Sequence, residues 1–137
     1  MKKDIIDDCS VVIRSVGERT EEACKDKLKE VFPEENITVI SDRPFSATLR
    51  KSLEHGLDKG LPWTFCVDAD VLIDRIGVQE LFNRARVERD HVFEMHGFVF
   101  DKFFNEVRPA GNHLYRTSHI PRAIQAIPQE GDSLRPE

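Results

Sequence analysis

The feature that most constrains this chain is the segment 63–70, in which a strand-like run ends in two aspartates, Asp68 and Asp70. Aromatic and β-branched residues fill the run, which is typical of a buried strand. Side chains two positions apart in an extended chain point to the same side, so the two carboxylates can converge on one target. Neighbouring carboxylates repel unless a cation lies between them, and their oxygens suit Mg²⁺ or Mn²⁺. The segment therefore predicts a divalent metal site, although a strand end followed by a helix cap would need no metal.

Composition limits the kind of protein this is. At 137 residues, with 39% hydrophobic and 33% charged residues, the chain fits one globular domain. The net charge of -5 argues against a nucleic-acid binder with a broad basic surface. No apolar run is long enough to cross a membrane, and Asp7 and Asp8 interrupt what would be a signal-peptide core. The three cysteines are odd in number and lack metal-ligand spacing. We therefore expect a cytoplasmic protein whose thiols are buried and reduced.

The first half of the chain alternates strand patterns with helix patterns. Strands are expected over residues 10–16, 37–41 and 63–72. The helices between them carry apolar stripes, formed by Cys24, Leu28, Val31 and Phe32 in the first and by Leu49, Leu53 and Leu57 in the second. This alternation predicts a βαβαβ unit with a parallel sheet and right-handed crossovers.

The second half is less regular. Asp74 is placed to cap a third helix, and residues 92–100 form a longer extended segment. Residues 101–108 are expected to return as a hairpin, and a short helix is expected over 121–127. We therefore divide one domain, residues 1–137, into a nucleotide-binding half over 10–72 and a partial acceptor half over 73–137.

Acidic residues follow each of the three expected strands. Glu18 comes after the first, Asp42 after the second, and the Asp68/Asp70 pair ends the third. Ligands of parallel α/β sheets bind outside the carboxyl ends of the strands. Three acidic positions at one edge of one sheet strengthen the metal hypothesis.

Taken together, these residues resemble the nucleotide-binding half of a GT-A glycosyltransferase of the broad family-2 group. The Asp68-x-Asp70 pair matches the family's metal-binding motif, and Glu18 and Asp42 match its acidic turns after the first two strands. The segment 111–118 is similar to the one that precedes a helix in the acceptor half. The resemblance covers about residues 10–120. It implies an α/β, Rossmann-like three-layer αβα sandwich with a mostly parallel central sheet.

The resemblance also implies roles for individual residues. A Mn or Mg ion at Asp68 and Asp70 would hold the diphosphate of a nucleotide sugar, and the sugar would pass to an acceptor hydroxyl. Residues expected to bind the nucleotide sugar are Arg14, Glu18, Arg19, Asp42 and Asp68, with Arg43 as a further cation near the phosphates. The family's catalytic base has weak counterparts in Asp132 and Glu137, with Glu130 also near that position. A full enzyme of the family continues beyond this point, so a minimal enzyme, a shortened domain and an inactive relative all stay open.

Each of these residues also has a purely structural interpretation. Arg14 could pair with a neighbouring carboxylate, Glu18 could favour a helix start, and Asp42 could form an Asx turn. A histidine often completes a GT-A metal site, but the spacing of His96, His113 and His119 does not point at the aspartates, so we expect structural roles for them.

Two other functions compete with sugar transfer. One is a non-catalytic module that binds a nucleotide or a partner at the same sheet edge. The other is an Asp-dependent phosphatase of the haloacid-dehalogenase type, although in those enzymes the Asp-x-Asp follows the first strand rather than the third. An open sheet edge would further favour a homodimer.

Overall fold

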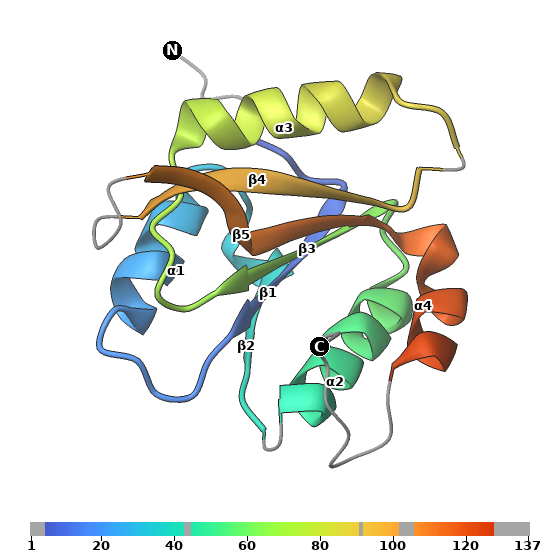
Figure 1. Ribbon diagram of the computed structural model, residues 1–137, viewed down its shortest axis with the longest axis horizontal. Coiled ribbons are helices and arrows are strands. Elements are labelled where there is room, and N and C mark those ends of the chain that lie inside the picture. Colours follow the sequence, from blue (N-terminus) through green and yellow to red (C-terminus); the bar gives the residue numbers. More distant parts are fainter. Residues whose placement is uncertain (1–4, 43–44, 91, 102–105, 128–137) are drawn as a thin grey trace.

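The computed structural model describes residues 5–42, 45–90, 92–101 and 106–127. In these residues the chain forms five strands and four α-helices, with two short 3₁₀ turns (Figure 1). In chain order they are β1 (Cys9–Arg14), α1 (Glu21–Lys29), η1 (Glu34–Asn36), β2 (Ile37–Ile40), α2 (Phe45–Lys59), β3 (Trp63–Asp68), α3 (Arg75–Val87), β4 (Glu94–Asp101), β5 (Glu106–Arg116), η2 (Thr117–His119) and α4 (Ile120–Ala126).

The strands form one mixed sheet in the order β2-β1-β3-β5-β4. β1 pairs in parallel with both β2 and β3, as the βαβαβ pattern predicted. β5 is antiparallel to both β3 and β4, and it lies between them. The expected α/β class is confirmed, but the expected mostly parallel sheet holds only for its β2-β1-β3 part. The second half of the chain adds an antiparallel hairpin, whose return strand covers the segment 111–116.

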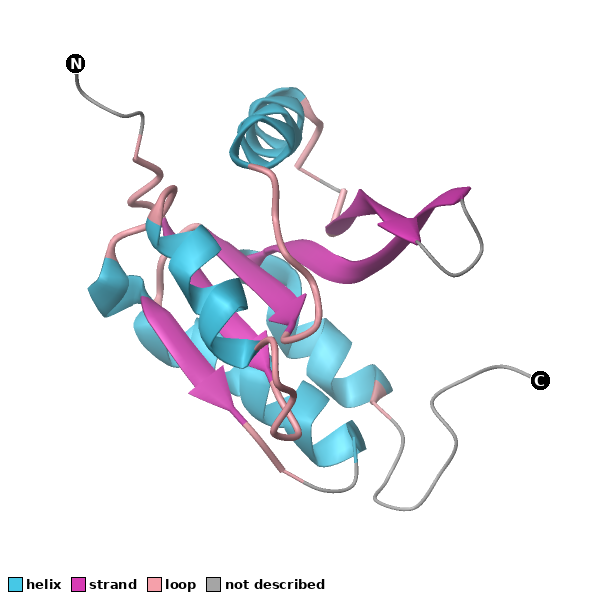
Figure 2. Ribbon diagram, turned by 90° about the vertical axis from the view of Figure 1, so that its left-hand side faces the viewer, coloured by secondary structure: helices cyan, strands magenta, loops and turns pink. Residues whose placement is uncertain are grey.

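Helices cover both faces of the sheet (Figures 1 and 2). On one face, α1 and α3 pack against alternate side chains of β1 and β3 around three mutually tilted rings, Phe32, Phe65 and Phe82. On the opposite face, Leu53 of α2 and Ile120 of α4 pack with Val12, Cys66 and Tyr115. All six residues of β1 are buried, which explains the uninterrupted apolar run from Val11 to Ile13 in its middle.

Helix α2 lies unusually close to β3. A Cβ added at Gly56 would fall 2.4 Å from the Thr64 hydroxyl oxygen and 2.6 Å from its methyl carbon. Thr64 is fully buried, and its hydroxyl is 2.9 Å from that of Thr117. A glycine at this helical position is therefore required by packing rather than by backbone conformation.

Local signals in the sequence set several of the helix ends. Asp74 caps α3 as predicted, since its carboxylate accepts a hydrogen bond of 3.0 Å from the Gly77 amide. Gly60, with a φ of 68°, follows the last residue of α2 in the left-handed conformation that commonly ends a helix. No helix within the described residues is both long and apolar enough to cross a membrane.

Candidate functional site

The Asp68–Asp70 segment is a hydrogen-bonded turn at the carboxyl end of β3. The strand ends at Asp68, and the Val71 amide donates to the Asp68 carbonyl oxygen at 3.0 Å. The Ala69 amide donates to the Arg14 carbonyl oxygen at 3.0 Å, and the Thr20 hydroxyl donates to the Ala69 carbonyl oxygen at 2.7 Å. The sequence argument placed both aspartates in an extended strand, and for Asp70 that was wrong. It is the turn, fixed to β1 and to the start of α1, that orients Asp70.

The two aspartates nevertheless reach one cavity. It has a volume of about 200 Å³ and lies beyond the carboxyl ends of β1 and β3. It is lined by Arg14, Ser15, Val16, Glu18, Thr48, Asp68 and Asp70. Four of the residues predicted to bind ligand or metal therefore surround a single space: Arg14, Glu18, Asp68 and Asp70.

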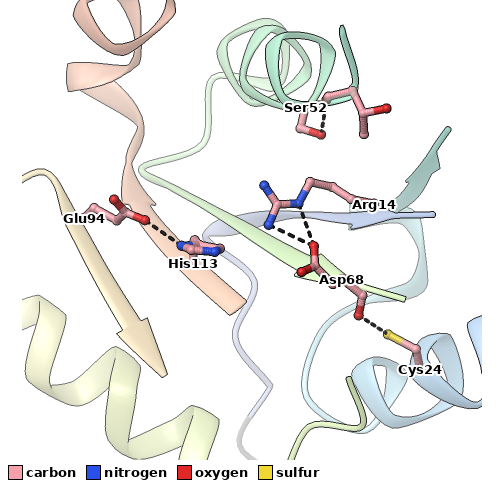
Figure 3. Close-up of polar contacts among 7 residues, drawn as sticks. Arg14, Cys24, Ser52, Asp68, Glu94 and His113 are labelled. Atoms are coloured by element: carbon pink, nitrogen blue, oxygen red, sulfur yellow. Dashed lines mark hydrogen bonds and ion pairs between the residues drawn. The ribbon is translucent and has the colours of Figure 1, made fainter. Parts of the chain in front are cut away.

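Arg14 and Asp68, which both line this cavity, form an ion pair (Figure 3). The Arg14 Nε and Nη2 atoms lie 3.0 Å and 2.9 Å from the same oxygen, Asp68 Oδ1. The Arg14 side chain is 5% exposed, whereas that of Asp68 is 38% exposed. The two residues are directly paired in the register of β1 and β3. The interpretation of Arg14 as a partner for a neighbouring carboxylate is thus confirmed, and Asp68 presents its charge to the open side.

Two more carboxylates, those of Glu18 and Asp70, line the cavity beside this ion pair. Glu18 accepts hydrogen bonds of 2.9 Å from the Val16 amide and the Ser15 hydroxyl, and Glu21 contacts the same hydroxyl. Burial acts to raise the pKa of Glu18, but the amides of Val16 and Glu18 and the Ser15 hydroxyl hold it below its ordinary value. Glu18 is therefore ionised at neutral pH, and its carboxylate is held by hydrogen bonds within the loop after β1.

The negative charges of these carboxylates also affect the pKa of a buried thiol nearby, that of Cys24. Burial, then the charges of Asp70 and Asp68 and more weakly of Glu21 and Glu18, raise the pKa of Cys24 to about 11. Its sulfur lies 3.8 Å from the Asp68 carbonyl oxygen (Figure 3). Cys24 is fully buried and protonated, so it is a core residue and not a nucleophile.

The remaining predicted residues lie at or beyond the edge of the cavity. Asp42 makes two backbone hydrogen bonds with the Thr48 hydroxyl, of 3.0 Å and 2.7 Å, and its carboxylate pairs with Lys51 of α2. Arg19 is exposed and does not line the cavity. Asp132, Glu137, Glu130 and Arg43 lie outside the described residues, so the predictions made for them stay predictions.

A second polar cluster lies on β4 and β5. Glu94 Oε2 is 2.7 Å from His113 Nδ1 and 2.9 Å from His96 Nε2 (Figure 3 shows the first contact). His96 and His113 face each other in register, with their rings edge to face and their centroids 4.4 Å apart. One ligand-type atom from each of the three residues lies within 4.8 Å of the others.

The two clusters share a face of the sheet. Arg14 pairs with Asp68, and Cys66, two residues before Asp68, pairs with His113. Residues in register and residues two apart point the same way, so both clusters lie on the side of α2 and α4. Cys66 lies between them, and the charges of Arg14, Asp68 and Glu94 all act on its thiol.

Sequence reasoning missed Glu94 altogether. It judged His96 and His113 only by their spacing from the aspartates and assigned them structural roles. The usable signal was the alternation Glu94-x-His96 in an extended segment, which places both side chains on one face. His119, in contrast, makes a structural contact, as expected: its Nε2 lies 2.6 Å from the Asp90 carbonyl oxygen.

A larger hollow, of about 530 Å³, lies away from both clusters between the N-terminal segment and α3. Arg86 of α3 forms two hydrogen bonds there with the Asp8 carboxylate, of 2.6 Å and 2.8 Å. Among the predicted site residues that the structure describes, none lines it. We interpret the Asp8–Arg86 pair as a link between the start of the chain and α3.

Comparison with known proteins yields similarity in structure alone. No protein-family model matches the sequence, and no curated protein matches it either. Among solved structures, the chain is similar to one described as the crystal structure of A197 from STIV, with a TM-score of 0.55 and 13% sequence identity. That match covers 92% of this chain and 71% of the other. At this identity the similarity concerns the fold and assigns no activity.

Proposed function

We propose that this chain is a GT-A-like domain that binds a nucleotide-diphosphate sugar in the cavity beyond β1 and β3 and transfers the sugar to an acceptor hydroxyl. The observation that supports this most is the convergence of Asp68, Asp70 and Glu18 with Arg14 on one space at the carboxyl ends of parallel strands. That is where open α/β sheets bind their ligands.

The charges of the cavity favour a ligand that brings its own cation. Three carboxylates and one guanidinium line it, which leaves an excess of two negative charges. A diphosphate alone would be repelled by this wall, whereas a diphosphate with Mg²⁺ or Mn²⁺ would not. Asp70 and the open side of Asp68 supply the hard oxygen ligands that such an ion prefers, so the residues fit the group.

Each residue of the site then has a distinct task. Arg14, fixed under Asp68, would hold that carboxylate in place and extend positive charge toward the phosphates. Glu18, held by the loop amides, would accept a hydrogen bond from the ribose or the base. The bound metal would neutralise the charge that develops on the leaving diphosphate.

In the proposed reaction, the bond between the anomeric carbon and the phosphate oxygen breaks, and a bond from that carbon to the acceptor oxygen forms. The nucleoside diphosphate leaves with the electron pair of the broken bond. The acceptor hydroxyl gives its proton to a carboxylate if the reaction inverts configuration. Asp132 and Glu137 are the candidates that the sequence offers for this base.

A non-catalytic binding module is the second candidate, and one observation favours it. The cavity that binds the nucleotide in our proposal is lined by β1 and the loop after it, by Thr48 of α2, and by the end of β3 and its turn, so binding requires no residue after position 72. Such a module would bind a nucleoside diphosphate with metal and would not consume a nucleotide sugar.

Two measurements on the purified full chain separate these candidates. Calorimetric titration with UDP and GDP, with and without Mn²⁺, tests binding, and release of UDP or GDP from the matching nucleotide sugar tests turnover. Metal-dependent binding with turnover supports the transferase, and metal-dependent binding without hydrolysis or transfer supports the module. Absence of nucleotide binding under every metal condition would reject both.

A further inference from the structure

We propose that Glu94, His96 and His113 form a second metal site, one for a borderline transition-metal ion of the zinc class, separate from the aspartate site. This proposal is independent of the function proposed above. It rests on three side chains of two adjacent strands that direct one oxygen and two nitrogen atoms to a common point.

The donor set distinguishes this site from the one at Asp68 and Asp70. Two imidazole nitrogens and one carboxylate oxygen are the ligands of many zinc centres, and Mg²⁺ strongly prefers oxygen ligands alone. The two imidazoles are equally suited to Co²⁺, which reports its coordination by visible absorption. The ion expected here is therefore chemically different from the one expected at the aspartates.

The present distances are compatible with a bound ion. A tetrahedral zinc ion with bonds of about 2.0–2.1 Å holds its ligand atoms about 3.4 Å apart. The two contacts to Glu94 Oε2, at 2.7 Å and 2.9 Å, would lengthen by about half an ångström or slightly more. The nitrogen atoms of His96 and His113 already lie within 4.8 Å of each other and would adjust to the same separation. Movements of this size lie within the rotation of histidine and glutamate side chains about their existing rotamers.

Surrounding contacts hold the ligands in place while leaving them accessible. The buried Tyr115 hydroxyl forms a hydrogen bond with the Glu94 carboxylate, and the Tyr115 ring stacks on His113 at 6.1 Å with an interplanar angle of 14°. The side chains of His113, Glu94 and His96 are 21%, 28% and 41% exposed. An ion can thus reach the site from solvent, and Tyr115 supplies the outer hydrogen bond that orients a metal ligand.

The register of the hairpin explains why the three side chains converge. His96 is opposite His113, and Glu94 is opposite Tyr115, which places Glu94 diagonally across from His113. Directly after His96 the pairing register shifts, and irregularities of this kind often redirect side chains next to sites. A slip of one residue would move His96 to the other face, so the site depends on this register.

The test uses the full chain, stripped with a chelator and titrated with Co²⁺ and then Zn²⁺. We expect one equivalent of Co²⁺ to produce a visible absorption band that Zn²⁺ abolishes. His96→Ala and His113→Gln should each weaken Co²⁺ binding by about 100-fold or more, and Tyr115→Phe by about 10-fold, as losses of ligands and of outer contacts do. His119→Ala, which removes a histidine that contacts the Asp90 carbonyl oxygen instead, should leave the affinity unchanged.

Crossed variants keep this proposal distinct from the aspartate site. Asp70→Ala should retain the Co²⁺ band, and His96→Ala, at a side chain that is 41% exposed and does not line the aspartate cavity, should retain any Mn²⁺-dependent nucleotide binding. The proposal is overturned if wild-type protein binds Co²⁺ no more tightly than His96→Ala, or if His119→Ala weakens binding as much as His96→Ala does.

Discussion

The Arg14–Asp68 pair and the Glu94–His96–His113 cluster lie on one face of one sheet, yet their carboxylates are compensated differently. Asp68 faces a guanidinium that is charged at every physiological pH and is almost fully buried. Glu94 faces two imidazoles that can be neutral and can each give a lone pair to a metal. The first arrangement fixes a charge in the lining of a cavity, and the second leaves its nitrogens available as ligands.

The largest effect should come from removing the carboxylate above the buried guanidinium. In Asp68→Asn, Arg14 keeps its charge but loses its principal ion-pair partner. We expect a loss of about 2–3 kcal/mol in the free energy of unfolding, below the usual cost of breaking a fully buried pair because Asp68 is partly exposed. Urea denaturation measures it, and Asp70→Asn, at an exposed position of the same turn, is the control. A loss equal to that of the control would show that Arg14 does not depend on Asp68.

Gly56→Ala tests the support that the two clusters share, because α2 covers the face on which both lie. Alanine normally stabilises a helix interior relative to glycine, but here its Cβ would overlap the Thr64 side chain. We expect a destabilisation of about 1–3 kcal/mol, typical of overpacking in a core. Thermal unfolding of the variant is the measurement. Increased stability would mean that α2 is less tightly seated on β3 than described.

Glu94→Gln should cost less than either change. Glutamine keeps the shape of this side chain and a hydrogen-bonding oxygen, so the loss of stability in metal-free protein should be about 1 kcal/mol or less. Zinc at 100 times its dissociation constant should raise the stability of wild-type protein by about 2.7 kcal/mol and that of this variant far less. Thermal unfolding with zinc and with a chelator gives both values. An equal response of the two proteins to zinc would contradict the assignment of Glu94 as a ligand.

The exposed Asp8–Arg86 pair provides a reference for the buried one, and its effect should be the smallest. The hydrogen bonds from Arg86 outweigh partial burial and hold the pKa of Asp8 below 3.8. Between the two pKa values the unfolded chain binds more protons, so the contribution of Asp8 is present above pH 3.8 and is lost as the pH falls through the native pKa.

The measurement for this pair is urea denaturation of wild type and Asp8→Asn across that pH range. We expect a difference of about 0.5 kcal/mol at neutral pH, since both side chains are about a third exposed, and convergence of the two proteins in acid. A difference that grows as the pH falls would be inconsistent with an ion pair.

The two clusters also differ in how far the sequence predicted them. The strands that carry Arg14 and Asp68 are visible as apolar runs, and parallel βαβ units bring their carboxyl ends to one edge. The site residues there follow from local patterns and one topological rule. Which oxygen of Asp68 meets Arg14, 54 residues away, depends on register, and Asp70 is oriented by a turn that strand periodicity does not reveal.

The histidine cluster could not be assembled by the same reasoning. Glu94 and His113 meet only because β5 is inserted antiparallel between β3 and β4. The position of β5 between two earlier strands depends on tertiary packing and not on a sequence motif. Leu114 packs in the core on one face of the sheet, and Tyr115 packs in the core on the other. The extended segments were predicted, but their pairing was not.

The measurement that tests the central claim most directly is calorimetric titration of UDP and GDP, with and without Mn²⁺, on wild-type protein and Asp70→Ala. Asp70 is exposed in a turn whose backbone is held by other residues, so the variant should fold normally. We predict that one nucleotide binds wild type only with Mn²⁺ and that Asp70→Ala abolishes this binding. Binding that is independent of Mn²⁺ and of Asp70, or absent from wild type altogether, would contradict the account.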